Sequence, residues 1–210
     1  AAGPSALSWA PRTAASSAAG LQPAQSGLDQ PGRRRPQWCM VRDAACAGFA
    51  LQGVYLFILD DLSRSGFSLG EASFWFGAVN VVPLFGCPLF GWLADEEGPV
   101  AALLAGLLAA AVATPTILVS DERVFGAIPA IAGFALLWGA TSALPGQLAP
   151  LILAKIVRSE KYGAALGAFF VVYGIAQAIG PIATGALADS FGGYKVPFII
   201  CALSFAIAAA

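Results

Sequence analysis

Residues 72–94, ASFWFGAVNVVPLFGCPLFGWLA, form an uninterrupted run of 23 residues without a charged side chain. A helix needs about 20 such residues to cross the roughly 30 Å hydrocarbon core of a bilayer. Ser68 and Glu71 stand directly before this run with the spacing of a capping box, in which two side chains satisfy the first free N–H groups of a helix. The stretch therefore predicts a transmembrane helix that begins at the membrane surface.

Other uncharged runs flank this one, and they cover residues 44–59, 98–120, 124–154, 162–188 and 196–210. The first is short, but residues 38–41 can extend it, and the last reaches the end of the sequence. Two crossings and a turn need over about 40 residues. We therefore expect 124–154 to be one helix, kinked at Pro145 or Pro150. The sequence predicts an all-α membrane protein with six transmembrane helices.

The composition agrees with a chain whose partner is the lipid bilayer. Hydrophobic residues make up 58% of the 210 and charged residues 11%, and the mean hydropathy is +0.76. Soluble domains carry about 25% charged residues. The net charge of −1 argues against a nucleic-acid partner, and the chain has no histidine, the commonest metal ligand and general base. We expect no catalytic residue, no metal and no cofactor, and therefore no enzyme.

Residues 1–37 differ from the rest, being rich in Ala, Ser, Pro, Gly and Gln and ending in three arginines. Such a segment buries too little apolar area to fold, so we expect a disordered basic linker, with the transmembrane part at 38–210. Eight basic residues fall on the side of the linker and three on the other, which predicts a cytoplasmic N-terminal segment. The sequence starts without Met and stops inside an apolar run, so we expect a fragment or a processed chain.

The pattern G-x-L-A-D-x-x-G occurs twice, at residues 91–98 and at residues 185–192. Each copy follows a Gly and Pro pair, and three helices separate the copies. An odd number of crossings puts the two copies on opposite faces of the membrane, as a three-plus-three inverted repeat requires. The alternative is convergence on the favoured chemistry of a helical hairpin. The marked positions are Gly91, Asp95, Gly98, Gly185, Asp189 and Gly192.

Residues 91–98 resemble the loop motif of the major facilitator superfamily, found between its second and third helices and again between the eighth and ninth. Residues 173–194 are similar to the eleventh helix of that superfamily and the turn into the twelfth. Residues 42–98 resemble the seventh and eighth helices of its drug:proton antiporters and vesicular-amine-transporter-like members. The resemblance implies that 38–210 is the C-terminal six-helix half and 1–37 the central cytoplasmic loop. The partner would be the missing N-terminal six-helix half or a second copy.

One departure from the family concerns the first loop. The family motif carries basic residues after the Asp and after the second Gly, where this sequence has Glu96, Glu97, Pro99 and Val100. The loop therefore lacks the basic half of the Asp–Arg brace that the resemblance implies. Asp95 is expected to cap the third helix instead, because the helix dipole stabilises a carboxylate at an N-terminus.

No charged residue lies near the middle of an expected helix, where charges usually mark ion pathways. A proton-coupling acid is therefore expected in the missing half, with Asp60 or Asp61 as the weaker option. Uncharged polar residues do lie inside the helices, and they either line a solute cavity or join helices by hydrogen bonds. These candidates are Gln52, Asn80, Gln147, Tyr173 and Gln177. Small residues at four-residue spacing indicate helix packing at Gly163, Gly167, Gly180 and Pro181.

The pattern and the resemblance together predict a secondary transporter that moves a small organic solute by alternating access, with proton-coupled antiport as one form. A monocarboxylate-like carrier is an alternative, since the turn at Gly192-Gly193-Tyr194 suits that group. A non-transporting membrane scaffold is another, which Glu96 and Glu97 favour.

Overall fold

In the computed structural model, residues 37–119 and 127–210 are described, and every regular element in them is a helix. This is the outcome that lipid imposes, because backbone N–H and C=O groups find no partners in hydrocarbon outside a helix or a closed barrel. The expected linker at 1–37 lies outside the described residues except for Gln37. The elements are α1 (Gln37–Tyr55), α2 (Ile58–Arg64), α3 (Leu69–Val81), α4 (Pro83–Glu96), α5 (Pro99–Ala113), the 3-10 helix η2 (Thr114–Val119), α6 (Ala127–Ser142), α7 (Leu144–Ile156), α8 (Ser159–Phe191) and α9 (Lys195–Ala209).

Four helical stretches of the described chain are long and apolar enough to cross a membrane: Leu69–Glu96, Pro99–Leu118, Ile128–Ile156 and Ser159–Phe191. A fifth is the pair Met40–Tyr55 and Ile58–Arg64, which bends by 43°. Within the described residues, each of the six apolar runs is thus mainly helical. The last, α9, has 15 residues, about 22 Å at 1.5 Å per residue, and is shorter than the others.

The helix boundaries follow local sequence signals. Ser68 Oγ accepts a hydrogen bond from the Glu71 N–H at 3.3 Å, and a Glu71 carboxylate oxygen accepts one from the Ser68 N–H at 3.0 Å. The predicted capping box is therefore confirmed. Helix α6 gives way to α7 at Ala143, two residues before Pro145, while Pro150 lies inside α7, so the interruption of this stretch lies beside the first of the two prolines.

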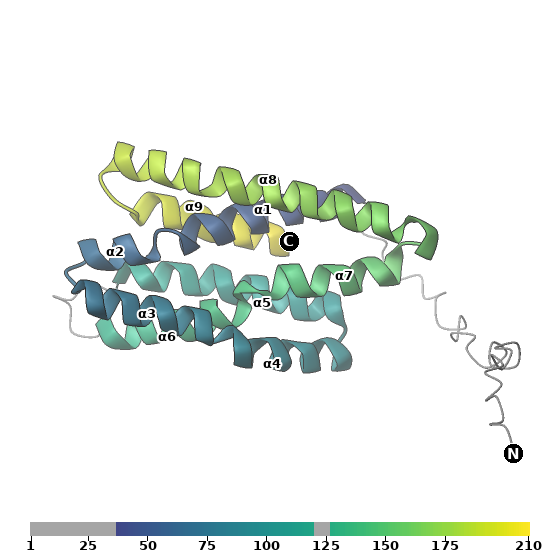
Figure 1. The fold of residues 1–210 in the computed structure, drawn as a ribbon, viewed down its shortest axis with the longest axis horizontal. Coiled ribbons are helices and arrows are strands. Elements are labelled where there is room, and N and C mark those ends of the chain that lie inside the picture. Colours follow the sequence, from purple (N-terminus) through teal and green to yellow (C-terminus); the bar gives the residue numbers. More distant parts are fainter. Residues whose placement is uncertain (1–36, 120–126) are drawn as a thin grey trace, which may run out of the picture. The chain divides into compact units, whose positions relative to one another are not determined.

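The two G-x-L-A-D-x-x-G patterns end in turns of the same kind. Gly98 has φ +96° and Gly192 has φ +69°, a region that favours glycine because it has no Cβ. Helix α4 continues through Asp95, and the N-cap of α5 is Gly98, so the expected capping of this helix by Asp95 is wrong. The α4–α5 turn and the α8–α9 turn lie at opposite ends of the helices (Figure 1).

Two close approaches between helices depend on glycine. A Cβ at Gly180 in α8 would overlap the Phe49 carbonyl oxygen of α1 and lie 3.2 Å from the Gly53 nitrogen. A Cβ at Gly86 in α4 would lie 2.5 Å from Ala140 Cα of α6. Backbone meets backbone at both points, as in other membrane helix pairs with small residues at the interface.

Gly163 and Gly167 differ from these positions. A Cβ built at either would meet nothing within 4 Å, so the described helices give this pair no packing partner. A packing role for the pair stays a prediction.

We expect Gly180→Ala to destabilise the protein by about 1–3 kcal/mol, the usual range for overpacking, because the new methyl group meets backbone that cannot rotate away. Thermal unfolding of the detergent-solubilised protein would measure this loss. The matched control is Gly174→Ala on the same helix, where a Cβ meets nothing within 4 Å. Equal stability of the two variants would contradict the close approach of α1 and α8.

Candidate functional site

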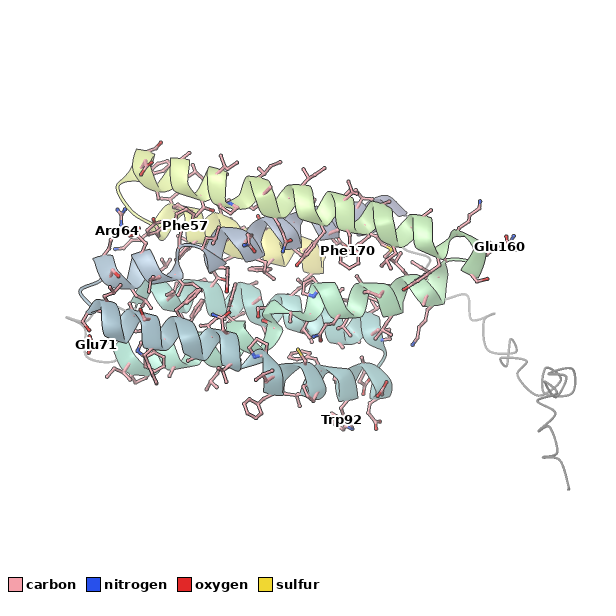
Figure 2. The ribbon with its side chains drawn as sticks, viewed as in Figure 1. Phe57, Arg64, Glu71, Trp92, Glu160 and Phe170 are labelled. Carbon is pink, nitrogen blue, oxygen red and sulfur yellow. The ribbon has the colours of Figure 1, made fainter. Side chains whose placement is uncertain are left out.

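Three aromatic or polar side chains from different helices lie at the same depth. One end of these helical stretches is marked by Arg64, Leu69 and Ile128. Figure 2 shows Arg64 and Glu71 at that end and Glu160 at the opposite end. Counting inward, Tyr55 is 9 residues from Arg64 (64 − 55), Asn80 is 11 from Leu69 (80 − 69) and Trp138 is 10 from Ile128 (138 − 128). At 1.5 Å per residue each is about 14–17 Å deep, near the middle of a 30 Å core.

These three residues stand beside interruptions in their helices. The α1–α2 bend follows Tyr55 directly, α3 gives way to α4 at Val82, and α6 gives way to α7 at Ala143. Only the first of these is bent by more than 40°. Interrupted helices are tolerated at membrane depth where neighbouring groups satisfy the freed backbone or where the segment lines a cavity.

A hydrogen bond joins two of the three helices at this level. Tyr55 Oη donates to Asn80 Oδ1 at 2.8 Å, and Asn80 Nδ2 donates to the Phe76 carbonyl oxygen at 2.7 Å. The Tyr55 ring also stacks on Trp138, with 6.3 Å between ring centroids, and packs at 5.3 Å from Phe76. We call Tyr55, Phe76, Asn80 and Trp138 the central cluster.

The central cluster keeps hydrogen-bonding capacity for a further group. Asn80 is exposed on the surface of the described helices, and its amide has a second N–H. Tyr55 is half-buried, and its hydroxyl oxygen accepts no bond from the described residues. The cluster carries no charge, so it can orient a neutral polar group but cannot neutralise an ion.

Trp138 forms the buried side of the cluster. Its side chain is 1% exposed, and its indole N–H is the one buried side-chain donor that lacks a partner among the described residues. Leaving a buried donor unpaired costs about 1–3 kcal/mol. The residue is therefore held by its ring packing with Tyr55 and Phe134 and not by hydrogen bonding.

The other predicted site residues are distributed over the helices. Gln52 is half-buried and lies one turn before Tyr55, on the same face of α1. Gln147 is exposed and donates to Cys87 Sγ at 3.0 Å, so it joins α7 to α4. Tyr173 is buried and stacks on Phe169 at 5.7 Å, and Gln177 is half-buried one turn further along α8. Asn80 is thus the predicted residue that the structure brings into the central cluster.

Sequence reasoning missed Tyr55 and Trp138. Tyr55 carries a hydroxyl one turn after Gln52, which is a signal that could have been used. Nothing local marks Trp138, because its role depends on contact with residues 83 positions away in the sequence (138 − 55).

Charged groups lie at the helix ends. Asp60 is exposed and pairs with Arg64 at 2.8 Å, whereas its neighbour Asp61 is 9% exposed. No group of three or more His, Cys, Asp or Glu side chains that could hold a metal ion occurs within 37–119 and 127–210.

We expect Tyr55→Phe to lower the free energy of unfolding by about 0.5–1.5 kcal/mol, because it removes one hydrogen bond and leaves the Asn80 oxygen unpaired. Tyr162→Phe is the matched control, since that hydroxyl reaches the Pro150 oxygen only at 3.4 Å. A double-mutant cycle with Asn80→Leu measures the coupling between the two side chains. Strict additivity of the two losses would show that the bond contributes nothing.

Comparison with known proteins places this arrangement in a family. Residues 44–210 match the Major Facilitator Superfamily. Over 157 residues the chain is 32% identical to human "Solute carrier family 67 member A1", an alignment that covers 70% of this chain and 34% of that protein. The chain thus spans about a third of the length of this relative. With four or five helical stretches able to cross a bilayer and a family match over most of its length, the chain is an integral, multi-pass membrane protein that belongs to the Major Facilitator Superfamily, a family of transporters and not typically of enzymes.

Proposed function

We propose that this chain is the C-terminal six-helix half of a secondary transporter that moves a small organic solute by alternating access. The observation that carries the proposal is the uncharged central cluster at mid-depth, beside interruptions in three helical stretches. Transporter sites of this kind lie near the bilayer midplane and are formed by discontinuous helices. The solute would contact Asn80 and Tyr55, with Gln52 and Gln177 on the neighbouring faces of α1 and α8.

A three-plus-three inverted repeat within the chain is part of the proposal. The same offset of 94 residues relates the close-approach glycines (180 − 86), the first pattern glycines (185 − 91) and the turn glycines (192 − 98). Gly86 meets the stretch Ile128–Ile156, and Gly180 meets α1, so each copy would use its second helix against the first helix of the other copy. This exchange supports a repeat and does not follow from convergence of two hairpin turns.

A partner half is proposed from the distribution of burial. Only 11% of the apolar window of Leu69–Glu96 and 17% of that of Ser159–Phe191 are buried, against 39% and 44% for the stretches Pro99–Leu118 and Ile128–Ile156. The two least covered stretches are the ones that carry Asn80 and Gln177. We propose that they face the N-terminal half, or a second copy, across the solute pathway, with residues 1–37 as the cytoplasmic loop between the halves.

The absence of charge in the central cluster bears on the charge of the solute and on where a proton-coupling acid would lie. A carboxylate solute would favour a basic partner in the site, and the middle of the described helices offers none, so an anion carrier is disfavoured for this half. Asp60 and Asp61 lie in the first turn of α2, and no hydrogen bond joins either to the central cluster within the described residues. A coupling acid, if transport is proton-driven, would then belong to the other half.

The test is saturable flux in proteoliposomes that contain the full-length protein. We expect Asn80→Leu and Gln177→Leu each to lower flux at least tenfold without reducing expression, because both remove a hydrogen-bonding amide from the pathway. Phe85→Leu is the control, a change at an exposed apolar position on the same stretch as Asn80.

Two outcomes would overturn parts of this proposal. Normal flux with Gln177→Leu would remove that residue from the site. Wild-type protein without saturable flux for any organic solute tested would favour the scaffold alternative.

A further inference from the structure

The first membrane-crossing stretch has a hinge where α1 ends and α2 begins. Leu56 and Phe57 belong to neither helix, and the two helices meet at 43°. The backbone pairing changes at this point: the Leu56 nitrogen lies 3.3 Å from the Gln52 oxygen, four residues back, and the Phe57 nitrogen lies 3.1 Å from the Val54 oxygen, three residues back. The hinge contains neither Gly nor Pro, so contacts with other helices must fix the angle of α2.

The hinge residue Phe57 packs into the second G-x-L-A-D-x-x-G pattern. A Cβ at Gly185, the first glycine of that pattern, would lie 3.3 Å from Phe57 Cζ. On its other side the Phe57 ring lies 5.1 Å from the ring of Tyr194, which follows the pattern in the α8–α9 turn. Gly185 and Tyr194 thus form a socket for the hinge.

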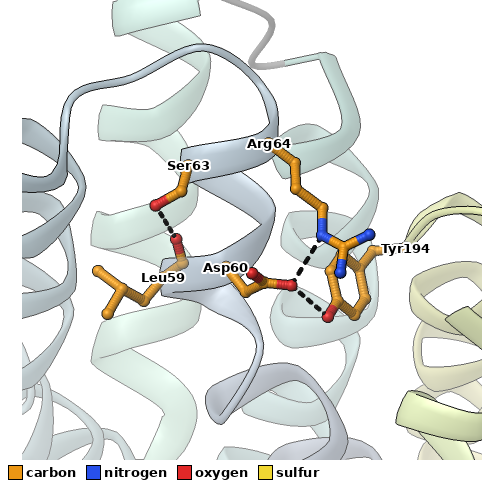
Figure 3. Close-up of polar contacts among 5 residues, drawn as sticks. All are labelled: Leu59, Asp60, Ser63, Arg64 and Tyr194. Carbon is orange, nitrogen blue, oxygen red and sulfur yellow. Dashed lines mark hydrogen bonds and ion pairs between the residues drawn. The ribbon is translucent and has the colours of Figure 1, made fainter. Parts of the chain in front are cut away.

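A second set of contacts ties α2 itself to the same turn (Figure 3). Tyr194 Oη donates to Asp60 Oδ2 at 2.5 Å, and Arg64 Nε donates to the same oxygen at 2.8 Å. The Arg64 guanidinium lies 5.2 Å from the centre of the Tyr194 ring, a cation–π distance. Tyr194 is 5% exposed and also stacks on Phe198 of α9, so the anchor on this side is rigid.

The electrostatics of the cluster favour this arrangement. Burial, followed by the hydrogen bond to Asp60, raises the pKa of Tyr194, so its hydroxyl stays a donor at any physiological pH. No ion pair joins an acid of either pattern, Asp95, Glu96, Glu97 or Asp189, to a basic side chain of the described residues.

We propose that Phe57, Asp60 and Arg64, held by Gly185 and Tyr194, form a latch that keeps α2 bent against the α8–α9 turn, and that its release lets α2 move as a gate at this membrane face. The latch can be tested by itself, and only its consequence for solute passage rests on the proposed transport function.

Release of the latch is compatible with its chemistry. The Asp60 and Arg64 side chains are 48% and 55% exposed, so water can replace their mutual contact. Exposed ion pairs contribute little to stability. The contact that holds α2 bent against the α8–α9 turn is the one between Asp60 and the buried Tyr194 hydroxyl. The experiment therefore removes this contact.

The experiment measures the distance between α2 and α8 in the full-length protein. Spin labels at Ser63→Cys and Ser190→Cys, with the native cysteines replaced, report this distance in lipid nanodiscs. We expect one dominant short-distance population in the parent protein. Tyr194→Phe and Asp60→Ala should each raise the population of a longer distance at least threefold, and the double variant should exceed neither single variant by much because both remove the same bond.

Tyr162→Phe at the other end of α8 is the control and should leave the distances unchanged. Gly185→Val provides an independent variant, since it fills the Phe57 socket without touching Asp60, and it too should favour the longer distance. Distance distributions unchanged by Tyr194→Phe, Asp60→Ala and Gly185→Val would overturn the latch. Altered distances in a protein that moves no solute would leave the latch standing and refute the proposed function.

Discussion

The structure depends on one constraint, that a backbone in hydrocarbon must satisfy its own hydrogen bonds. The constraint explains why each apolar run is a helix, and it also makes every interruption of a helix informative. The described chain interrupts three stretches, beside Tyr55, beside Asn80 and after Trp138. Polar and aromatic side chains from different helices meet near these places. The interrupted helices therefore lie next to the candidate site.

Glycine contacts decide which parts of the helices are fixed and which can move. Backbone contact at Gly180 holds α1 against α8 as far as the hinge. Beyond the hinge α2 is held by its side chains: Ile58 and Leu62 are buried in the core, and Phe57 and Asp60 contact Tyr194 of the α8–α9 turn. With the proposed latch, the first stretch would be fixed on one side of the central cluster and adjustable on the other. A transporter that opens one face at a time needs this difference.

Much of the fold could be predicted from the sequence, because the signals are local. The apolar runs predicted the helices, and Ser68 with Glu71 predicted the start of α3. Pro145 indicated the interruption of the fourth stretch. The bend at Leu56 and Phe57 could not be predicted, since neither residue breaks helices and the bend is set by contacts with Gly185 and Tyr194. For the same reason Asn80 was recognised as a candidate but its partner Tyr55 was not. The expected capping by Asp95 failed because α4 extends two residues further than the apolar run does, to Glu96.

The central claim is that the face carrying Asn80 is turned toward a water-filled pathway and not toward lipid. The direct test is the rate at which a membrane-impermeant maleimide labels Asn80→Cys in the cysteine-free full-length protein, compared with Phe85→Cys on the same stretch. The account predicts that position 80 is labelled at least tenfold faster than position 85. Equally slow labelling of both positions would place Asn80 in lipid and contradict the account.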